Sequence, residues 1–474
     1  MVFLLIEKEL KNLLLSPKFV ATFAACTVLI LVSVFAGIIE YRAGSAQYTA
    51  ATALVSQELT ESTSWPQLGE RQRIFRRPEV MQIFASGIHY DIGRFSVISS
   101  WQDVQLQQSS YSIEPIFAVF RAMDFVFIVQ VVLSLLTIVF AYDLVSGEKE
   151  SGTLRLMLAN AVPRTQYIVA KLAGAWVGLM IPLIIPLLLG VLLLMLYAIP
   201  FTGDDWVRLA KLAGYSLVYL TGFLSLGVLF STLTHRSAMS FLSLLVFWIA
   251  MVLVVPRGGM MFATQIYPVP SASEVESRKE GFARERRDTF FQELSAAFQA
   301  RSQAHEGMSE ADRAAYEEEN EWDWMVEDDE RQKGMESDLA EHNRQIDEQI
   351  NNARAVQQSL GFALSRFSPA SAYQLAAMRL GQTDLGLKQR FTDALYAYRT
   401  TFRAYIDQKN PGGMMSFGGN QSTEPLDLSD MPVFEARLPS APEDASPVDL
   451  LVLMGYIFGS AGLALVAFNR YDVR

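Results

Sequence analysis

The sequence has little of what holds a secreted domain or a metal centre together. Cys26 is its only cysteine, so the chain cannot form an intramolecular disulfide bond, and any domain outside the cytoplasm must be held by packing alone. The four histidines are scattered, and His305-Glu306 lacks the second histidine of an H-E-x-x-H zinc motif. We therefore expect no metal site and no metalloprotease activity.

The sequence also lacks a G-x-x-x-x-G-K-[ST] motif, the glycine-rich loop that cradles nucleotide phosphates. We expect no catalytic residue and no bound cofactor in this chain, and no nucleic-acid partner. Charged residues are few inside its long apolar runs, which argues against a proton-coupled carrier with an ionisable relay in mid-membrane. The N-terminus does not resemble a cleaved signal peptide, so we expect the first apolar run to be retained.

What the sequence does have is apolar length. The mean hydropathy is +0.21, and half of the residues are apolar. A bilayer core of ~30 Å needs roughly 20 apolar residues as helix, because lipid offers no partner to backbone N–H and C=O groups. Six segments meet this requirement, which predicts an all-α polytopic membrane protein. The predicted spans are 19–39, 122–142, 172–197, 209–233, 237–255 and 448–468.

Lysine and arginine in the short loops predict the orientation, since such loops are retained in the cytoplasm. The basic residues gather before the first span, between the second and third spans, between the fourth and fifth, and after the sixth. Both termini, the loop 143–171 and the tail 469–474 are then cytoplasmic. The segments 40–121 and 257–447 would lie outside, and both are too long to be simple turns.

The second outer segment, 257–447, is predicted to be a large, mainly helical domain. Its net charge accounts for essentially the whole charge of the chain, which is −11. The run Glu317 to Glu330 is its most acidic part and is expected to be a solvated helix face, with a site for a metal or a cationic substrate as the alternative. Glycine, proline and serine between Asn410 and Ser446 predict a flexible or extended connector to the last span.

Residues 1–18 predict an amphipathic helix that lies in the membrane interface. Phe3, Ile6, Leu10 and Leu13 fall on one helical face. Ser16-Pro17 then ends this helix before the first span. An ordinary anchoring flank is the alternative to a functional role.

The loop 143–171 contains Ser146-Gly147-Glu148-Lys149-Glu150-Ser151-Gly152-Thr153-Leu154, followed by Pro163-Arg164 and Lys171. Charged residues and glycines lead into a short amphipathic helix, with Leu154 and Leu158 on one side. Such a helix can dock into a groove of a soluble partner. The alternative is that the charges only keep the loop solvated and oriented.

These residues resemble the loop between the second and third spans of ABC-2 type permeases, the membrane subunits of a large class of ABC exporters. The six spans, the interfacial helix, the cytoplasmic termini and Ser368-Pro369-Ala370-Ser371 extend the resemblance. It is closest to a branch with a long insertion before the last span, related to permeases of copper-enzyme maturation and gliding motility. The resemblance implies the architecture of a type V exporter in the bacterial inner membrane.

The resemblance also implies roles and partners. The loop would act as a coupling helix that contacts a separate ATPase dimer, which would hold ATP and Mg. Carried over by position, the contact residues are Glu148, Lys149, Glu150, Gly152, Thr153, Leu154, Arg155, Leu158 and Arg164. A second copy or a sister permease would complete the pathway, and an extracytoplasmic partner protein is an open prospect. The function is then export of a substrate; the alternative is a mechanotransmitting or scaffold membrane protein, in which the ATPase moves the outer domain and nothing crosses the membrane.

Overall fold

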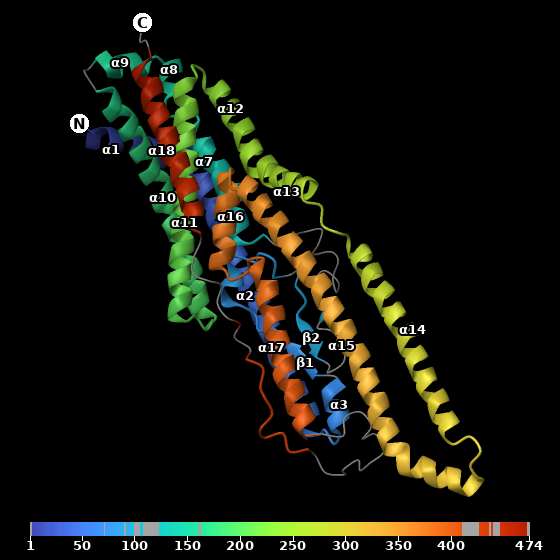
Figure 1. The fold of residues 1–474 in the computed structure, drawn as a ribbon. Helices are drawn as coiled ribbons and strands as arrows, with labels where there is room; N and C mark the ends of the chain where they lie inside the picture. The colour runs from blue at the N-terminus through green and yellow to red at the C-terminus, as the bar shows by residue number, and fades with distance from the viewer. Residues whose placement is uncertain are drawn as a thin grey trace. The chain divides into compact units, whose positions relative to one another are not determined.

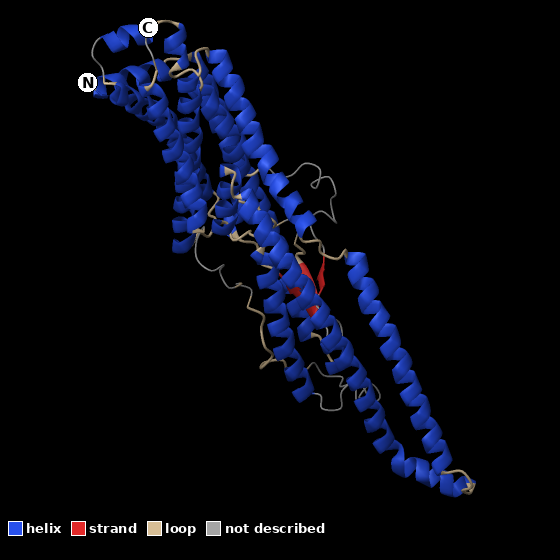
Figure 2. Cartoon of the chain, turned by 45° about the horizontal axis from the view of Figure 1, so that its top comes forward, coloured by secondary structure: helices blue, strands red, loops and turns tan. Residues whose placement is uncertain are grey.

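The computed structural model describes residues 2–70, 72–89, 92–98, 105–107, 123–159, 163–409, 426–435, 438 and 446–471. They form two compact units. The first comprises Met1–Pro256 together with Arg366–Arg474, and the second comprises Arg257–Ser365. Figure 1 labels their elements, and Figure 2 shows that helix predominates in both.

Among the described residues, six helical segments are long and apolar enough to cross a membrane, which confirms the all-α polytopic fold. The helices of these segments in the first unit are α2 (Pro17–Thr60), α6 (Phe125–Phe127) with α7 (Ser134–Ala141), α10 (Arg164–Leu196), α11 (Gly203–Leu233), α12 (Ser237–Ile249) and α18 (Pro447–Asn469). The fifth segment continues past α12 to Ile266, through α13 (Val255–Ile266).

The helix α2 is far longer than the predicted span 19–39. At 1.5 Å per residue its 44 residues extend about 66 Å, twice the thickness of a bilayer core. Ser16 caps it by accepting a hydrogen bond from the Phe19 amide (3.2 Å), and Pro17 occupies its first turn, so the predicted break after the N-terminal helix is confirmed. Residues 40–60 therefore continue the first span as helix.

Two spans contain π-helical turns, η2 (Ile128–Leu133) and η3 (Ala250–Val254). The wider turn disturbs the regular backbone hydrogen bonds, and neighbouring side chains bond to carbonyls within it. The Tyr219 hydroxyl donates to the Gln130 carbonyl of η2 (2.8 Å), and the Ser368 hydroxyl donates to the Met251 carbonyl of η3. Both π-turns are thus tied to other elements of the first unit.

The helix α16 (Pro369–Leu380) is buried in the core of the first unit. Its tyrosine, Tyr373, stacks on Tyr219 with ring centroids 4.7 Å apart and shares a 2.9 Å hydrogen bond with Ser216. Asp449 at the start of α18 accepts a 2.7 Å bond from Arg366, just before α16. The prediction of one outer domain over 257–447 is therefore wrong, because the compact second unit ends at Ser365 and α16 packs among the spans.

A small mixed subdomain follows α2 within the first unit. The helix α3 (Trp65–Glu70) precedes a three-stranded antiparallel sheet of β1 (Gln72–Phe75), β2 (Phe95–Ile98) and β3 (Gln105–Gln107), in the order β1-β2-β3. The register pairs Gln72 with Ile98 and Phe95 with Gln107. The sheet packs on α17 (Gly386–Lys409) through a shared apolar cluster, and η1 (Val80–Ile83) packs against α2.

The predicted connector 410–446 lies largely outside the described residues, but its middle part is ordered by packing. Leu426, Leu428, Met431 and Phe434 contact the apolar cluster of α17, and Tyr398 donates to the Pro432 carbonyl (3.0 Å). Residues 426–435 therefore agree with the extended form of the predicted connector and not with the flexible one.

The second unit is built mainly from two long antiparallel helices, α14 (Ala272–Ala304) and α15 (Glu310–Ser365). Ion pairs and one ring contact join them: Lys279 pairs with Asp347 (2.7 Å), Arg286 with Asp338 (2.8 Å), and Phe282 stacks on His342. Figure 1 shows the turn that connects the two helices. The predicted helical character of this part is confirmed by the structure.

Candidate functional site

Both termini of the first unit lie at the same end of its helix bundle, beside α8 (Ser146–Glu150) and α9 (Thr153–Ala159) (Figure 1). This arrangement agrees with an even number of crossings. Gly152 separates α8 from α9 with φ +74°, a conformation that favours glycine. Residues 160–162 lie outside the described residues, and Pro163 precedes α10. The loop thus consists of two short helices between two spans.

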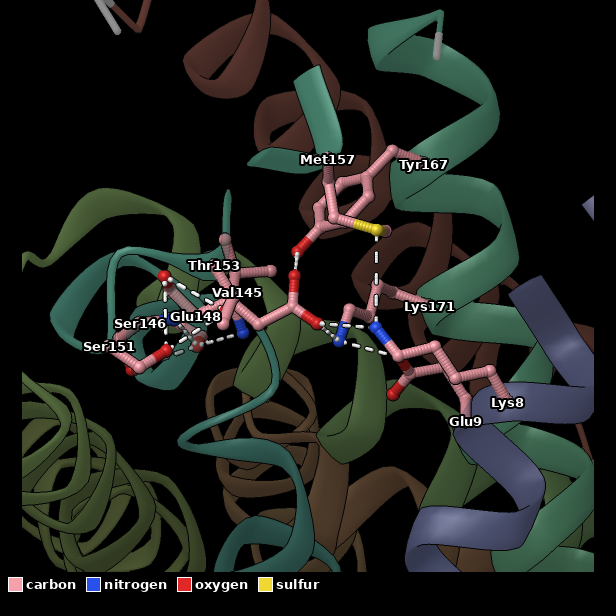
Figure 3. A network of polar contacts seen from close by, with 11 residues as sticks. Lys8, Glu9, Val145, Ser146, Glu148, Ser151, Thr153, Met157, Tyr167 and Lys171 are labelled. Atoms are coloured by element: carbon pink, nitrogen blue, oxygen red, sulfur yellow. Dashed lines mark hydrogen bonds and ion pairs between the residues drawn. The ribbon is translucent and has the colours of Figure 1, made fainter. Parts of the chain in front are cut away.

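A buried ionic network joins the loop to α10 and to α1 (Val2–Leu14). Lys171 of α10 has 4% of its surface exposed, and its Nζ lies 2.8 Å from both Glu148 Oε1 and Glu9 Oε1. The Tyr167 hydroxyl donates to the other oxygen of Glu148 (2.5 Å). Figure 3 shows these side chains converging from the three elements. Lys171 therefore contacts both carboxylates, and each oxygen of the Glu148 carboxylate has a partner.

The helix α1 can reach this network because α10 has a glycine where the two helices touch. A Cβ placed on Gly174 would lie 2.7 Å from the Cβ of Glu9, closer than real side-chain atoms approach. Lys8 adds an outer contact at 3.7 Å from Glu148 Oε1 and 4.0 Å from the Met157 sulfur. The spacing between α1 and α10 is thus set by the absence of a side chain.

The start of α8 is bound to the end of α11. The backbone amides of Val145 and Ser146 both donate to the Ser231 hydroxyl at 2.9 Å. Lys149 donates to the carbonyls of Thr232 and Thr234 (the latter at 3.1 Å), where a cation complements the carbonyl end of a helix. Its ammonium also lies 4.6 Å from the Tyr471 ring centre.

Two further contacts join the loop and its return segment to the neighbouring spans. Glu150 accepts a 3.1 Å hydrogen bond from the Ser237 amide at the start of α12, where a negative charge is favourable. Arg164, in the first turn of α10, donates to the Asn469 carbonyl at the end of α18 (2.6 Å). Tyr167 stacks on Phe468 of α18 with ring centroids 5.0 Å apart. The loop and the first turns of α10 therefore contact α11, α12, α18 and α1.

The nine predicted contact residues divide into two groups. Leu154 is 1% exposed and packs in the apolar cluster with Tyr167 and Phe468, so it offers no surface to a partner. Glu148, Lys149 and Arg164 are engaged by the protein's own helices, as described above. The exposed residues of the set are Glu150, Gly152, Thr153 and Arg155, with Leu158 half-buried.

Sequence reasoning missed two residues of this region. Leu156 is 69% exposed, because it projects away from the side of α9 that carries Leu154. The sequence could have indicated this exposure, because Leu156 does not share a helical face with Leu154 and Leu158. Glu9 is buried although its neighbours Glu7 and Lys8 are exposed, and a single acidic residue gives no pattern that distinguishes it.

The N-terminal helix is present at Val2–Leu14, and its predicted apolar residues are placed unevenly. Phe3 is exposed, whereas Ile6 and Leu10 are half-buried, and the side chain of Leu13 lies outside the described residues. Lys11 and Glu7 form the expected i,i+4 ion pair at 2.7 Å, which holds the pKa of the Glu7 carboxyl below its usual value.

Six apolar helical segments and a loop helix bound to the ends of several spans define a multi-pass membrane protein with a structured loop at one end of its bundle. The chain belongs to the ABC-2 family transporter proteins, whose family model matches residues 3–473. It is accordingly a permease of the ABC-2 type, a membrane subunit of an ABC transporter. None of the curated proteins compared with the chain matches it.

Proposed function

We propose that the chain is the permease subunit of an ATP-driven exporter, and that a separate ATPase subunit docks on the exposed face of the loop helices α8 and α9. Glu150, Thr153, Arg155 and Leu156 form this face. The loop would lie in the cytoplasm, as the distribution of lysine and arginine predicts. A second copy of the chain or a sister permease would complete the transport pathway.

The observation that supports this role most is the attachment of one short loop to many helices. Glu148 connects it through Lys171 to α10 and α1, Lys149 to the end of α11, and Glu150 to the start of α12. A displacement of the loop by a closing ATPase dimer would therefore move several helix ends together, as a rigid body. A loop that only needed to be solvated would not require buried charges.

The proposal predicts that two changes on the exposed face abolish ATPase binding while the fold survives. We expect Arg155→Glu combined with Leu156→Asp to lower co-purification of the ATPase subunit at least tenfold, because both side chains are exposed at the docking surface. The matched control is Arg470→Glu, an exposed charge reversal at the end of α18. Equal co-purification for the double variant and the control would overturn the assignment.

Mechanotransmission remains a second candidate because α14 and α15 fold as a compact unit of their own. The two functions differ in what stimulates the ATPase. For an exporter, a transported compound added to the reconstituted complex raises ATP hydrolysis and is itself moved across the vesicle membrane. For a mechanotransmitter, hydrolysis changes the protease sensitivity of the second unit without movement of any compound.

A further inference from the structure

The helix α15 carries acidic residues on two faces, and the faces differ in whether basic residues neutralise them. The face toward α14 is neutralised: Arg301 holds Asp328 at 2.7 Å and Glu327 at 3.3 Å, and Arg331 holds Asp328 at 2.6 Å. The guanidinium of Arg301 also lies over the Trp324 ring. These contacts account for the acidic residues that α14 covers.

The opposite face of α15 lacks such neutralisation over residues 318–326, whereas one turn further on Asp329 pairs with Lys333 (2.6 Å). Glu318, Glu319, Trp322, Met325 and Val326 lie on it at the i, i+1, i+4, i+7, i+8 spacing of one helical side. Trp322 is 70% exposed, and Val326 is also exposed. Among the residues that the structure describes, Glu318 and Glu319 have no ion pair or side-chain hydrogen bond, and neither have the adjoining Glu321 and Asp323.

A surface with an apolar centre and unpaired carboxylates at its border is complementary to one kind of partner. A partner must offer apolar side chains for Trp322 and Val326 and cations for the glutamates, while an acidic partner or an anionic lipid surface would be repelled. The helix α15 has 16 acidic and five basic residues, so a second copy of the same helix would meet like charge. Solvation explains the glutamates but not the exposed tryptophan among them.

We propose that this face of α15, defined by Glu318, Glu319, Trp322, Met325 and Val326, docks a cationic amphipathic polypeptide segment of a partner protein. Trp322 is the apolar anchor, and the unpaired carboxylates steer the partner and select its charge. The inference goes beyond the transport role, and it rests on the proposed topology only in placing the partner outside the cytoplasm.

The test uses the full-length protein in phosphatidylcholine nanodiscs and a fluorescent helical Leu/Lys peptide as the probe. Binding is measured by fluorescence anisotropy, with empty nanodiscs subtracted. We expect a dissociation constant on the order of micromolar that weakens with added salt. A Ser/Lys peptide of equal charge and a Leu/Glu peptide of equal apolarity should each bind at least tenfold more weakly, because each lacks one half of the complementary surface.

Two pairs of variants locate the binding surface. Trp322→Ala should weaken binding of the Leu/Lys peptide at least fivefold, whereas Phe298→Ala, which removes a 71% exposed aromatic ring from α14, should not. Glu318→Gln with Glu319→Gln should weaken it similarly and flatten the salt dependence. The charge-matched control is Glu276→Gln with Glu285→Gln, two exposed glutamates of α14.

Three results would overturn the proposal. They are equal effects of variant and control, equal binding of the Leu/Glu peptide, and a shift of the protein from dimer to monomer caused by Trp322→Ala, which would make the face a contact between copies. Its failure is distinguishable from failure of the transport role. Trp322→Ala should leave ATPase co-purification unchanged, and Arg155→Glu with Leu156→Asp should leave peptide binding unchanged.

Discussion

The protein contains two groups of the same composition, a cation between two carboxylates, in opposite surroundings. In the first unit Lys171 lies 2.8 Å from Glu9 and 2.8 Å from Glu148, and all three side chains are buried or nearly so. In the second unit Arg344 lies 2.8 Å from Glu341 and 2.8 Å from Glu348, and all three are exposed. The distances match, so burial is the variable that separates them.

Burial changes what such a group does. The charges of an exposed ion pair are well solvated whether or not they are paired, so the pair has little effect on stability. A buried cation has lost its water, and its carboxylates have lost theirs, so each partner depends on the others. The second unit has many ion pairs on its helices, yet the buried group around Lys171 in the first unit should constrain the position of α1, α8 and α10 more strongly.

Removing the central cation of each group should separate the two units most clearly. Lys171→Met removes the cation between Glu9 and Glu148 and leaves only the outer contact from Lys8 to Glu148 (3.7 Å), which should cost about 3–5 kcal/mol of stability. Arg344→Met removes a cation with two carboxylate partners as well, but all three groups are in water, so we expect a change close to zero. Thermal unfolding of the two variants in detergent measures the difference.

Glu148→Gln adds a control within the buried group. Lys171 keeps Glu9 as its partner, and a glutamine oxygen can still accept the Tyr167 hydroxyl, so this variant should lose clearly less stability than Lys171→Met. Equal losses for Lys171→Met and Arg344→Met would mean that water reaches the buried group, and the distinction between the two units would fail.

The sequence predicted the helices of the first unit well and the partners of its charges poorly. The spans follow from hydropathy, because lipid enforces long apolar helices. The sequence did not predict α16 as part of the bundle, because its 12 residues are too few to span a bilayer and its small side chains give little hydropathy. Glu148 and Lys149 were predicted as contacts of an ATPase, but which helix of this chain each binds depends on contacts as distant in sequence as Lys149 and Thr232.

A smaller loss of stability should follow when α1 is pushed away from the buried group. Gly174→Ala places a Cβ 2.7 Å from that of Glu9, which forces α1 away from α10 and should cost about 1–3 kcal/mol. Gly214→Ala is the matched control, because the same change in α11 meets nothing within 4 Å. The gain in helix propensity is shared, so Gly214→Ala should be neutral or stabilising by up to about 1 kcal/mol. Equal thermal stabilities would show that α1 does not depend on this contact.

A change of pH should have the smallest effect on the stability of the protein. His89 of the first unit is half-buried, and its Nδ1 lies 3.2 Å from Arg76, which can only donate. Burial, together with Arg76 and Arg94, lowers the pKa of His89 well below 6.5. In the exposed group, the hydrogen bonds from Arg344 and Gln345 lower the pKa of Glu341 to about 2. Between pH 7 and pH 5, therefore, Glu341 stays ionised in the folded protein, whereas the fold opposes protonation of His89.

The direction follows from proton binding by the two states. Below pH 6.5 the unfolded chain protonates His89 more readily than the folded protein does, so the stability that neutral His89 allows is present above pH 6.5 and is lost as pH falls. We expect the melting temperature of the protein to fall between pH 7 and pH 5, and His89→Gln to fall less over the same range. The same decline in both proteins would show that His89 accepts a proton in place, which requires the Arg76 contact to open without loss of the fold.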